Sequence, residues 1–209
     1  MSGHMIVPDF LLGRKTQTKS FTVLADDHWT FKTDANYQVA HDAANADECW
    51  LTEGWNTVGQ IYPAPDVGGY RIGRTLLYYD TSALPDDANI LYADIRMFVR
   101  EKDVAEDFDV VVVDGSGLDP ACNLSNYGLL LPRTQSLGSI NTSEFTVPQL
   151  VIIDLNDLAM ALISKIGITV FGVRSSHDIN STPLQSDNYI AFDGYEWSSP
   201  SRLVITYLG

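Results

Sequence analysis

Five consecutive residues in the C-terminal half of the chain combine the side chains of a serine hydrolase. The segment Arg174-Ser175-Ser176-His177-Asp178 places serine, histidine and aspartate next to one another. A nucleophilic triad requires these side chains to converge in space, which neighbours in one short segment do not usually achieve. The chain also contains no Gly-x-Ser-x-Gly nucleophile elbow. We therefore expect a hydrogen-bonded turn after a strand here, and we predict no catalytic residue and no enzyme.

Histidines and carboxylates could also hold a metal or cleave a glycosidic bond. His28, His41 and His177 are not at metal-ligand spacing with one another or with a cysteine, so no zinc site is predicted. The carboxylate pairs are typical of solvated turns or strand edges: Asp26-Asp27, Asp86-Asp87 and Asp107 with Asp109. A glycosidase needs two carboxylates at a fixed separation across a sugar. A glycan-active enzyme is therefore the third hypothesis.

Oxygen ligands near the C-terminal strands make calcium the one cofactor considered. Asp187, Asp193 and Glu196 are the predicted ligands, and Asp26 and Asp27 could contribute as well. No Asp-x-Asp-x-Asp-Gly loop accompanies them. Calcium therefore remains an option that the sequence does not require.

Aromatic side chains are the strongest candidates for ligand binding. Trp55 and Tyr62 lie in a predicted long loop, residues 53–69, and Trp197 lies in the loop before the last strand. An exposed indole offers a flat apolar face that suits the C–H face of a sugar. The alternative is that each ring packs down as a loop anchor. Trp50 is the fourth carbohydrate candidate. Because it lies on a predicted strand, a position in the core is expected more often than a position on a ligand-binding surface.

Composition restricts the class of partner. The chain has 209 residues, with 27 acidic against 13 basic side chains and a formal net charge of −14. Nucleic acid and anionic membrane surfaces both require basic side chains, so neither is a predicted partner. Carbohydrate or a protein surface remains, and a homo-oligomer is open. Ordinary solubility explains most acidity of this kind.

The two cysteines and the N-terminus indicate little about the compartment. Cys49 and Cys122 could form one disulfide in an exported protein or remain two buried thiols, and we expect thiols. No apolar run is long enough to span a membrane, and no signal peptide is evident. The first five residues resemble a cloning remnant, so we divide the chain into a remnant and arm (1–20) and one domain (21–209).

Hydrophobic periodicity predicts an all-β domain. Residues 70–99 predict a strand, a short turn and a second strand in the manner of a hairpin. Further strands are predicted at residues 21–24, 28–33, 37–40, 48–51, 108–113, 142–147, 149–154, 168–174, 189–193 and 202–207. Residues 125–131 predict a helical turn. Residues 157–166 predict a helix that Asn156 caps and Gly167 ends. Without regular alternation of strands and helices, the fold class is a single antiparallel β-sandwich, jelly-roll-like, with one or two short helices.

The predicted hairpin also carries a family resemblance. Its residues 74–85, followed by Ala88, Ile90, Ala93 and Ile95, resemble the strand–turn–strand of DNRLRE-type jelly-roll modules, which are related to carbohydrate-binding modules. Residues 189–193 and 200–207 resemble the ending of such modules. Residues 126–142 and 165–176 are similar to related domains of phage and bacterial surface proteins. The six-residue signature that names the family is absent.

The resemblance implies a non-catalytic module of an extracellular or virion-associated protein. We therefore expect a structural or adhesion module for which carbohydrate is the ligand considered. The alternative is a self-assembling subunit of a capsid, tail or fibre with no small ligand.

Overall fold

The computed structural model describes residues 14–51, 55–65 and 68–209, and these residues form an all-β sandwich-like fold. Its strands are β1 (Thr16–Thr22), β2 (His28–Asp34), β3 (Glu48–Trp50), β4 (Trp55–Ile61), β5 (Tyr70–Asp80), β6 (Asn89–Val104), β7 (Asp109–Asp114), β8 (Gly138–Asn141), β9 (Gln149–Asp154), β10 (Ile168–Ser175), β11 (Asn188–Asp193) and β12 (Arg202–Leu208). The short helices are α1 (Tyr37–His41), α2 (Asn126–Leu130), α3 (Asp157–Leu162) and α4 (Ser176–Ile179), with a 3₁₀ turn at Thr142–Glu144.

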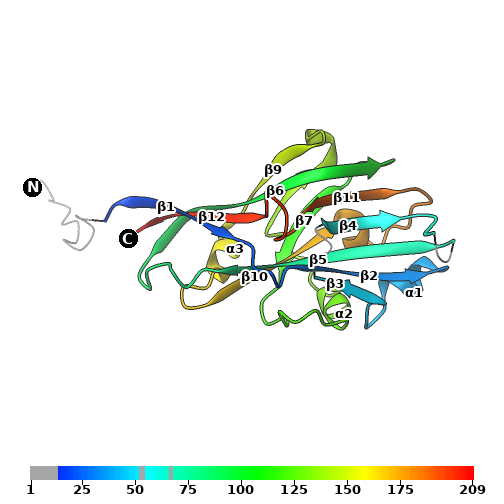
Figure 1. Cartoon of the computed structure of the whole chain (residues 1–209), viewed down its shortest axis with the longest axis horizontal. Coiled ribbons are helices and arrows are strands. Elements are labelled where there is room, and N and C mark those ends of the chain that lie inside the picture. The colour runs from blue at the N-terminus through cyan, green and yellow to red at the C-terminus, as the bar shows by residue number, and fades with distance from the viewer. Residues whose placement is uncertain (1–13, 52–54, 66–67) are drawn as a thin grey trace, which may run out of the picture.

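One antiparallel sheet curls so that its two halves face each other (Figure 1). The strand order is β1-β12-β6-β11-β4-β5-β10-β7-β8, with β2 beside β5 and β9 beside β6. We call the half that contains β1, β12, β6, β9 and β11 the open layer. The half that contains β2, β5, β10 and β7 is the covered layer, because α1 and α2 lie on its outer side.

The core fills the space between the two layers. Alternate residues of β6, from Ala93 to Val99, point inward and meet side chains such as Leu77 of β5 and Phe171 of β10. β7 is buried on both faces. Val110 and Val112 belong to the central core, whereas the intervening valines pack outward under α2.

A buried ion cluster fastens the helices to the covered layer. Asp178 of α4 accepts hydrogen bonds from the guanidinium groups of Arg74 on β5 and Arg174 on β10, with N–O distances of 2.6–2.9 Å. Arg74 also donates to the Tyr127 carbonyl of α2 at 2.7 Å and to the His41 carbonyl of α1 at 3.0 Å. Burial would raise the pKa of Asp178, but the two guanidinium groups hold it well below its usual range. The cluster therefore holds α1, α2 and α4 against the outer side of the covered layer.

The prediction of a hairpin over residues 70–99 is wrong, although both strands exist. β5 pairs with β2, β4 and β10, and β6 pairs with β9, β11 and β12, so the two strands do not pair with each other. The Thr81 hydroxyl donates to the Ser164 carbonyl at 2.7 Å. That bond ties the connection to a different part of the chain, so the turn joins the two layers.

The predicted loop at residues 53–69 is also wrong in its middle. Residues 55–61 form β4, which pairs with β5 and β11, while residues 52–54 and 66–67 lie outside the described part of the chain. Gly59 has a φ of 120°, and a Cβ there would collide with the backbone of Asn188. Glycine at position 59 is therefore required because β4 and β11 approach each other too closely for a side chain, and it does not mark a loop.

Three other elements differ from prediction. Residues 37–40 lie in α1, whose first turn the Asn36 side chain caps by accepting from the Gln38 amide at 2.9 Å. Residues 142–144 form a 3₁₀ turn in place of a strand. α3 ends at Leu162, four residues before the predicted end at 166. At the N-terminus, Thr16–Thr22 is an edge strand along β12, and residues 1–13 lie outside the described part.

Candidate ligand-binding site

The outer face of the open layer remains exposed to solvent. Tyr92 of β6 and Leu150 and Ile152 of β9 all point outward and are 40–49% exposed. Cross-strand register places Leu150 opposite Phe98 and Ile152 opposite Arg96 on this same face. A contiguous surface of exposed apolar side chains is typical of a binding surface.

A tryptophan pair stands at one end of this face. The β4–β11 register places Trp55 opposite Asp193, and the loop that carries Trp197 begins directly after Asp193. The two indole rings lie 6.0 Å apart between centroids, inclined at 38°, and are about equally exposed at 40% and 39%.

Arg100 of β6 joins the tryptophan pair to the rest of the face. Its guanidinium lies 4.9 Å from the ring centroid of Trp197 and 4.9 Å from that of Phe98. Asp193 holds it in place through paired hydrogen bonds, of which the Nη2–Oδ2 bond is 2.9 Å. Trp55, Trp197, Arg100 and Phe98 therefore form a continuous row of flat side chains.

A groove of about 610 Å³ continues from this row across β6, β12 and β1. Phe98 and Leu150 supply apolar wall, Ser198 and Ser199 supply hydroxyl groups, and Arg96 and Arg202 supply positive charge. None of the described residues that line the groove carries a carboxylate. The groove is large enough for a small organic ligand or a short stretch of oligosaccharide.

Asp27 is buried beneath the tryptophan pair, with 2% of its surface exposed. It accepts a hydrogen bond from the Asn56 side chain at 2.5 Å and a long one from the Tyr195 amide at 3.4 Å. Desolvation raises the pKa of Asp27 to about 7, although the hydrogen bond from Asn56 opposes the rise. Asp27 and Glu196 line one cavity, but its volume is about 10 Å³, roughly enough for one water molecule.

The other two predicted aromatic residues lie elsewhere or deeper. Tyr62 follows the far end of β4 and packs on Tyr70, with ring centroids 4.7 Å apart. Trp50 packs against Trp29 at 5.7 Å, and its indole N–H donates to Glu48 at 2.6 Å. The structure therefore brings together Trp55 and Trp197, places Trp50 behind them and separates Tyr62 from them.

The three predicted calcium ligands do not converge. Asp193 is fully buried and is engaged by Arg100, and Asp187 accepts from the Tyr62 amide at 2.7 Å beyond the opposite end of β11. Glu196 lies in the Trp197 loop. The described residues therefore provide no shared position at which these three carboxylates could hold one ion.

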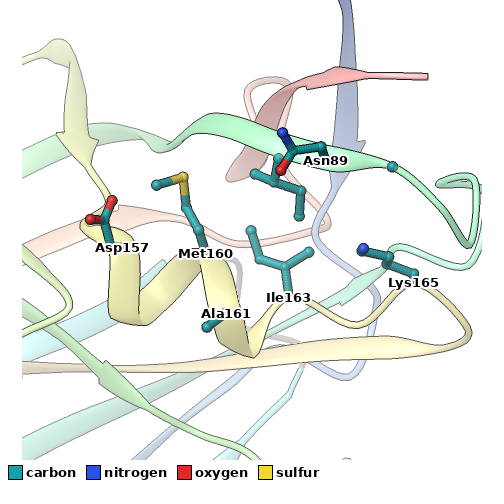
Figure 2. Close-up of a pocket in the computed structure, with 8 residues that line it drawn as sticks. Asn89, Asp157, Met160, Ala161, Ile163 and Lys165 are labelled. Atoms are coloured by element: carbon teal, nitrogen blue, oxygen red, sulfur yellow. The ribbon is translucent and has the colours of Figure 1, made fainter. Parts of the chain in front are cut away.

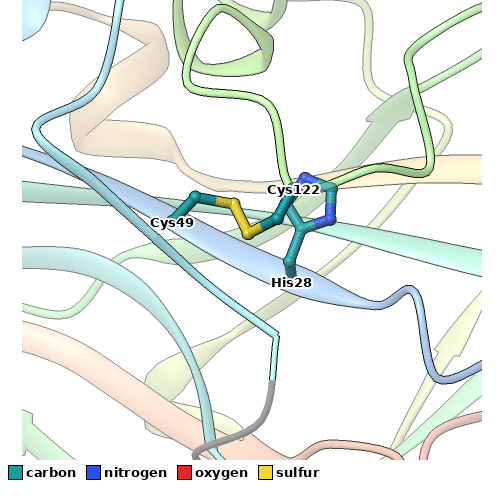
Figure 3. A group of neighbouring side chains, drawn as sticks. All are labelled: His28, Cys49 and Cys122. Carbon is teal, nitrogen blue, oxygen red and sulfur yellow. A yellow bond between two sulfur atoms is a disulfide. The ribbon is translucent and has the colours of Figure 1, made fainter.

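Cys49 and Cys122 form a disulfide, so the expectation of two free thiols is wrong. Their α-carbons lie 5.7 Å apart, and the bond joins β3 to the segment before α2. His28 lies close enough to complete a set of three possible metal ligands within 4.8 Å (Figure 3). Because the sulfurs are bonded to each other, neither is a thiolate ligand in this state.

The Arg174–Asp178 segment has structural contacts throughout. Ser175 caps α4, Ser176 accepts from the Asp109 amide at 3.0 Å, and Asp178 belongs to the arginine cluster. The His177 ring packs against Phe108, with centroids 5.6 Å apart. The Asp178 carboxylate is therefore committed to arginines and does not orient the histidine.

A second hollow, of about 380 Å³, lies between α3 and the start of β6. Figure 2 shows Met160 and Ile163 of the α3 region facing Asn89 of β6, with Asp157 and Lys165 toward its two ends. It holds no aromatic side chain among its described lining residues. The hollow therefore combines one acidic, one basic and several apolar side chains, and this combination favours no particular class of ligand.

Sequence reasoning considered Asp27 only as a possible calcium ligand, and it missed Arg96, Phe98, Leu150 and Arg202 as site residues. The alternation along β6, β9 and β12 places these four residues on the outward face of their strands, which was a usable signal. The register between strands was required to show that they share one groove.

Comparison with known protein families and with curated protein sequences finds no match. No described helix is both long and apolar enough to cross a membrane.

Proposed function

We propose that this protein is a non-catalytic adhesion module that binds carbohydrate on the outer face of its open layer. The observation that carries the proposal is the exposed Trp55–Trp197 pair, which Arg100 connects to Phe98 in the wall of the groove. Apolar ring faces pack against the C–H faces of sugar rings, while the indole N–H stays available to solvent or hydroxyl groups. Ser198 and Ser199 add hydrogen-bonding groups in the groove itself.

The chemistry of the candidate residues favours binding over catalysis. Asp27 and Glu196 surround a cavity that admits roughly one water molecule, so no sugar bond fits between these carboxylates. Asp178 is neutralised by two arginines. The surroundings of Asp27, Glu196 and Asp178 are therefore those of structural carboxylates and do not resemble those of catalytic carboxylates.

An extracellular or virion-associated location agrees with the disulfide, because such bonds persist in oxidising compartments. The DNRLRE-type resemblance of the strands and turn over residues 70–99 favours the same class of protein. Its matching positions are core and turn residues, so the resemblance supports the fold more strongly than the ligand.

Self-assembly is the second candidate, favoured by one observation. Tyr92, Leu150 and Ile152 expose apolar surface on the open layer, and a second copy could cover them. Multi-angle light scattering across a range of protein concentration distinguishes the two candidates. A dimer or larger species that Leu150→Asp converts to a monomer would favour assembly.

A glycan array followed by titration calorimetry tests the carbohydrate proposal. Trp55→Ala and Trp197→Ala should each weaken binding about tenfold or more, equivalent to about 1.4 kcal/mol, because each removes one stacking surface. Leu129→Ala is the matched control, since Leu129 is 51% exposed on α2, across the molecule. Absence of binding to every glycan would refute the proposal.

A further inference from the structure

Two arginines face each other across neighbouring strands in the floor of the groove. The β6–β12 register pairs Arg202 directly with Arg96, and both side chains point to the outer face of the open layer. Like charges directly opposite on a sheet destabilise it. The arrangement is unusual in a chain whose acidic residues outnumber its basic ones by 27 to 13.

The two guanidinium groups differ in what already neutralises them. Arg96 donates to Asp94 through Nε at 2.6 Å and Nη2 at 3.2 Å, and this hydrogen bonding raises the pKa of Arg96. Asp94 itself is buried and does not line the groove. Arg202 is exposed and has no hydrogen bond or ion pair with any described residue. The groove therefore carries one positive charge that the fold leaves available.

The surroundings of Arg202 match an anionic sugar. Hydroxyl groups of Ser198 and Ser199 lie along the same groove, and Phe98 provides an apolar wall that leads through Arg100 to Trp197. Guanidinium groups bind carboxylate and sulfate oxygens in a planar, paired geometry. A sugar ring on the tryptophan pair can thus place a neighbouring acidic ring over the arginines.

We infer that the groove binds the anionic group of an acidic oligosaccharide, a carboxylate or a sulfate ester, with Arg202 as its principal contact and Arg96 beside it. This inference rests on the carbohydrate-binding function proposed above and narrows the ligand to acidic glycans. A ligand that neutralises Arg202 also removes the repulsion between the two arginines. The chain's net charge of −14 disfavours nonspecific binding of acidic polymers, which makes a specific site for an anionic group informative.

The test uses the full chain on an array of neutral, carboxylated and sulfated oligosaccharides, followed by calorimetry with the strongest ligand. Arg202→Gln should weaken binding of the acidic ligand at least tenfold and leave neutral glycans unaffected. Lys165→Gln removes the same charge beside α3, outside the groove, and should change nothing. Arg202→Lys should recover part of the affinity, because it restores charge without paired geometry.

The outcomes separate the two proposals. Preference for acidic glycans that Arg202→Gln abolishes supports the inference, and the carboxylated and sulfated arms identify which anion is bound. Binding to neutral glycans that depends on Trp55 but not on Arg202 overturns the inference and leaves the proposed function intact. Equal loss of affinity in Lys165→Gln overturns it too, since net charge would then explain the effect. No binding to any glycan overturns both.

Discussion

Replacing Asp27 with asparagine should abolish a specific pH dependence of stability. Asp27 is 2% exposed, and desolvation raises its pKa to about 7 from an ordinary value of 3.8. Between these two values the folded protein keeps the proton that the unfolded chain has released. The free energy of unfolding must therefore fall as the pH rises from about 4 to 7.

The size of the effect follows from the separation of the two pKa values. At about 1.4 kcal/mol per pH unit, the difference corresponds to about 4 kcal/mol of stability that is present below pH 4 and absent above pH 7. Asp27→Asn keeps a side-chain oxygen that can accept from Asn56, but it cannot ionise. The variant should therefore gain about 4 kcal/mol relative to the native protein between pH 4 and pH 8.

Urea unfolding followed by tryptophan fluorescence, at constant ionic strength and at half-unit intervals of pH, measures this difference. Other titrating groups affect both proteins equally and cancel in the comparison. Asp26→Asn is the matched control, since it removes one charge at the exposed neighbouring position. If the stability curves of Asp27→Asn and the native protein run parallel from pH 4 to pH 8, the assignment of a buried, proton-binding Asp27 is refuted.

Two further predictions concern the scaffold that presents the site. Asp178→Ala should lower the free energy of unfolding by about 4 kcal/mol at pH 7, because it leaves the guanidinium groups of Arg74 and Arg174 buried without a counter-charge. Chemical denaturation measures this loss. A loss below about 1 kcal/mol would contradict a stabilising role of the Arg74–Asp178–Arg174 cluster. Reduction of the Cys49–Cys122 disulfide should also cost about 4 kcal/mol, because the bond closes a segment of 73 positions. The double variant Cys49→Ser/Cys122→Ser should show the same loss and no response to reductant.

The sequence predicted strands well where alternation and β-branched side chains agreed. β2, β7 and β9 to β12 each match a predicted segment, because these strands are rich in β-branched, aromatic and other apolar residues. β4 was mistaken for a loop because Gly59 and the flanking glycines and prolines are normally turn residues. Its glycine is required by the backbone of β11, a contact between positions about 130 residues apart. α1 was mistaken for a strand because a single helical turn is too short to show a helical period.

The candidate site was also predictable only in part, because its residues are brought together by contacts between strands that are distant in the sequence. Trp55 and Trp197 were proposed from residue type, and their contact depends on the pairing of β4 with β11. No motif in the sequence marks Arg96 or Arg202 as site residues. Only the register between β6 and β12 sets them opposite each other, and register between distant strands is not encoded in local pattern.

The contrast between the two outer faces is the strongest argument for where function lies. On the covered layer, the Arg74–Asp178–Arg174 cluster is buried, hydrogen-bonded and covered by short helices. On the open layer, apolar rings are left in water, and Arg202 faces Arg96 with no acidic partner of its own among the described residues. Both features of the open layer lower stability in isolation. A ligand with a flat apolar face and an anionic group would relieve both, and this common requirement favours an acidic sugar over either a neutral sugar or a purely apolar partner.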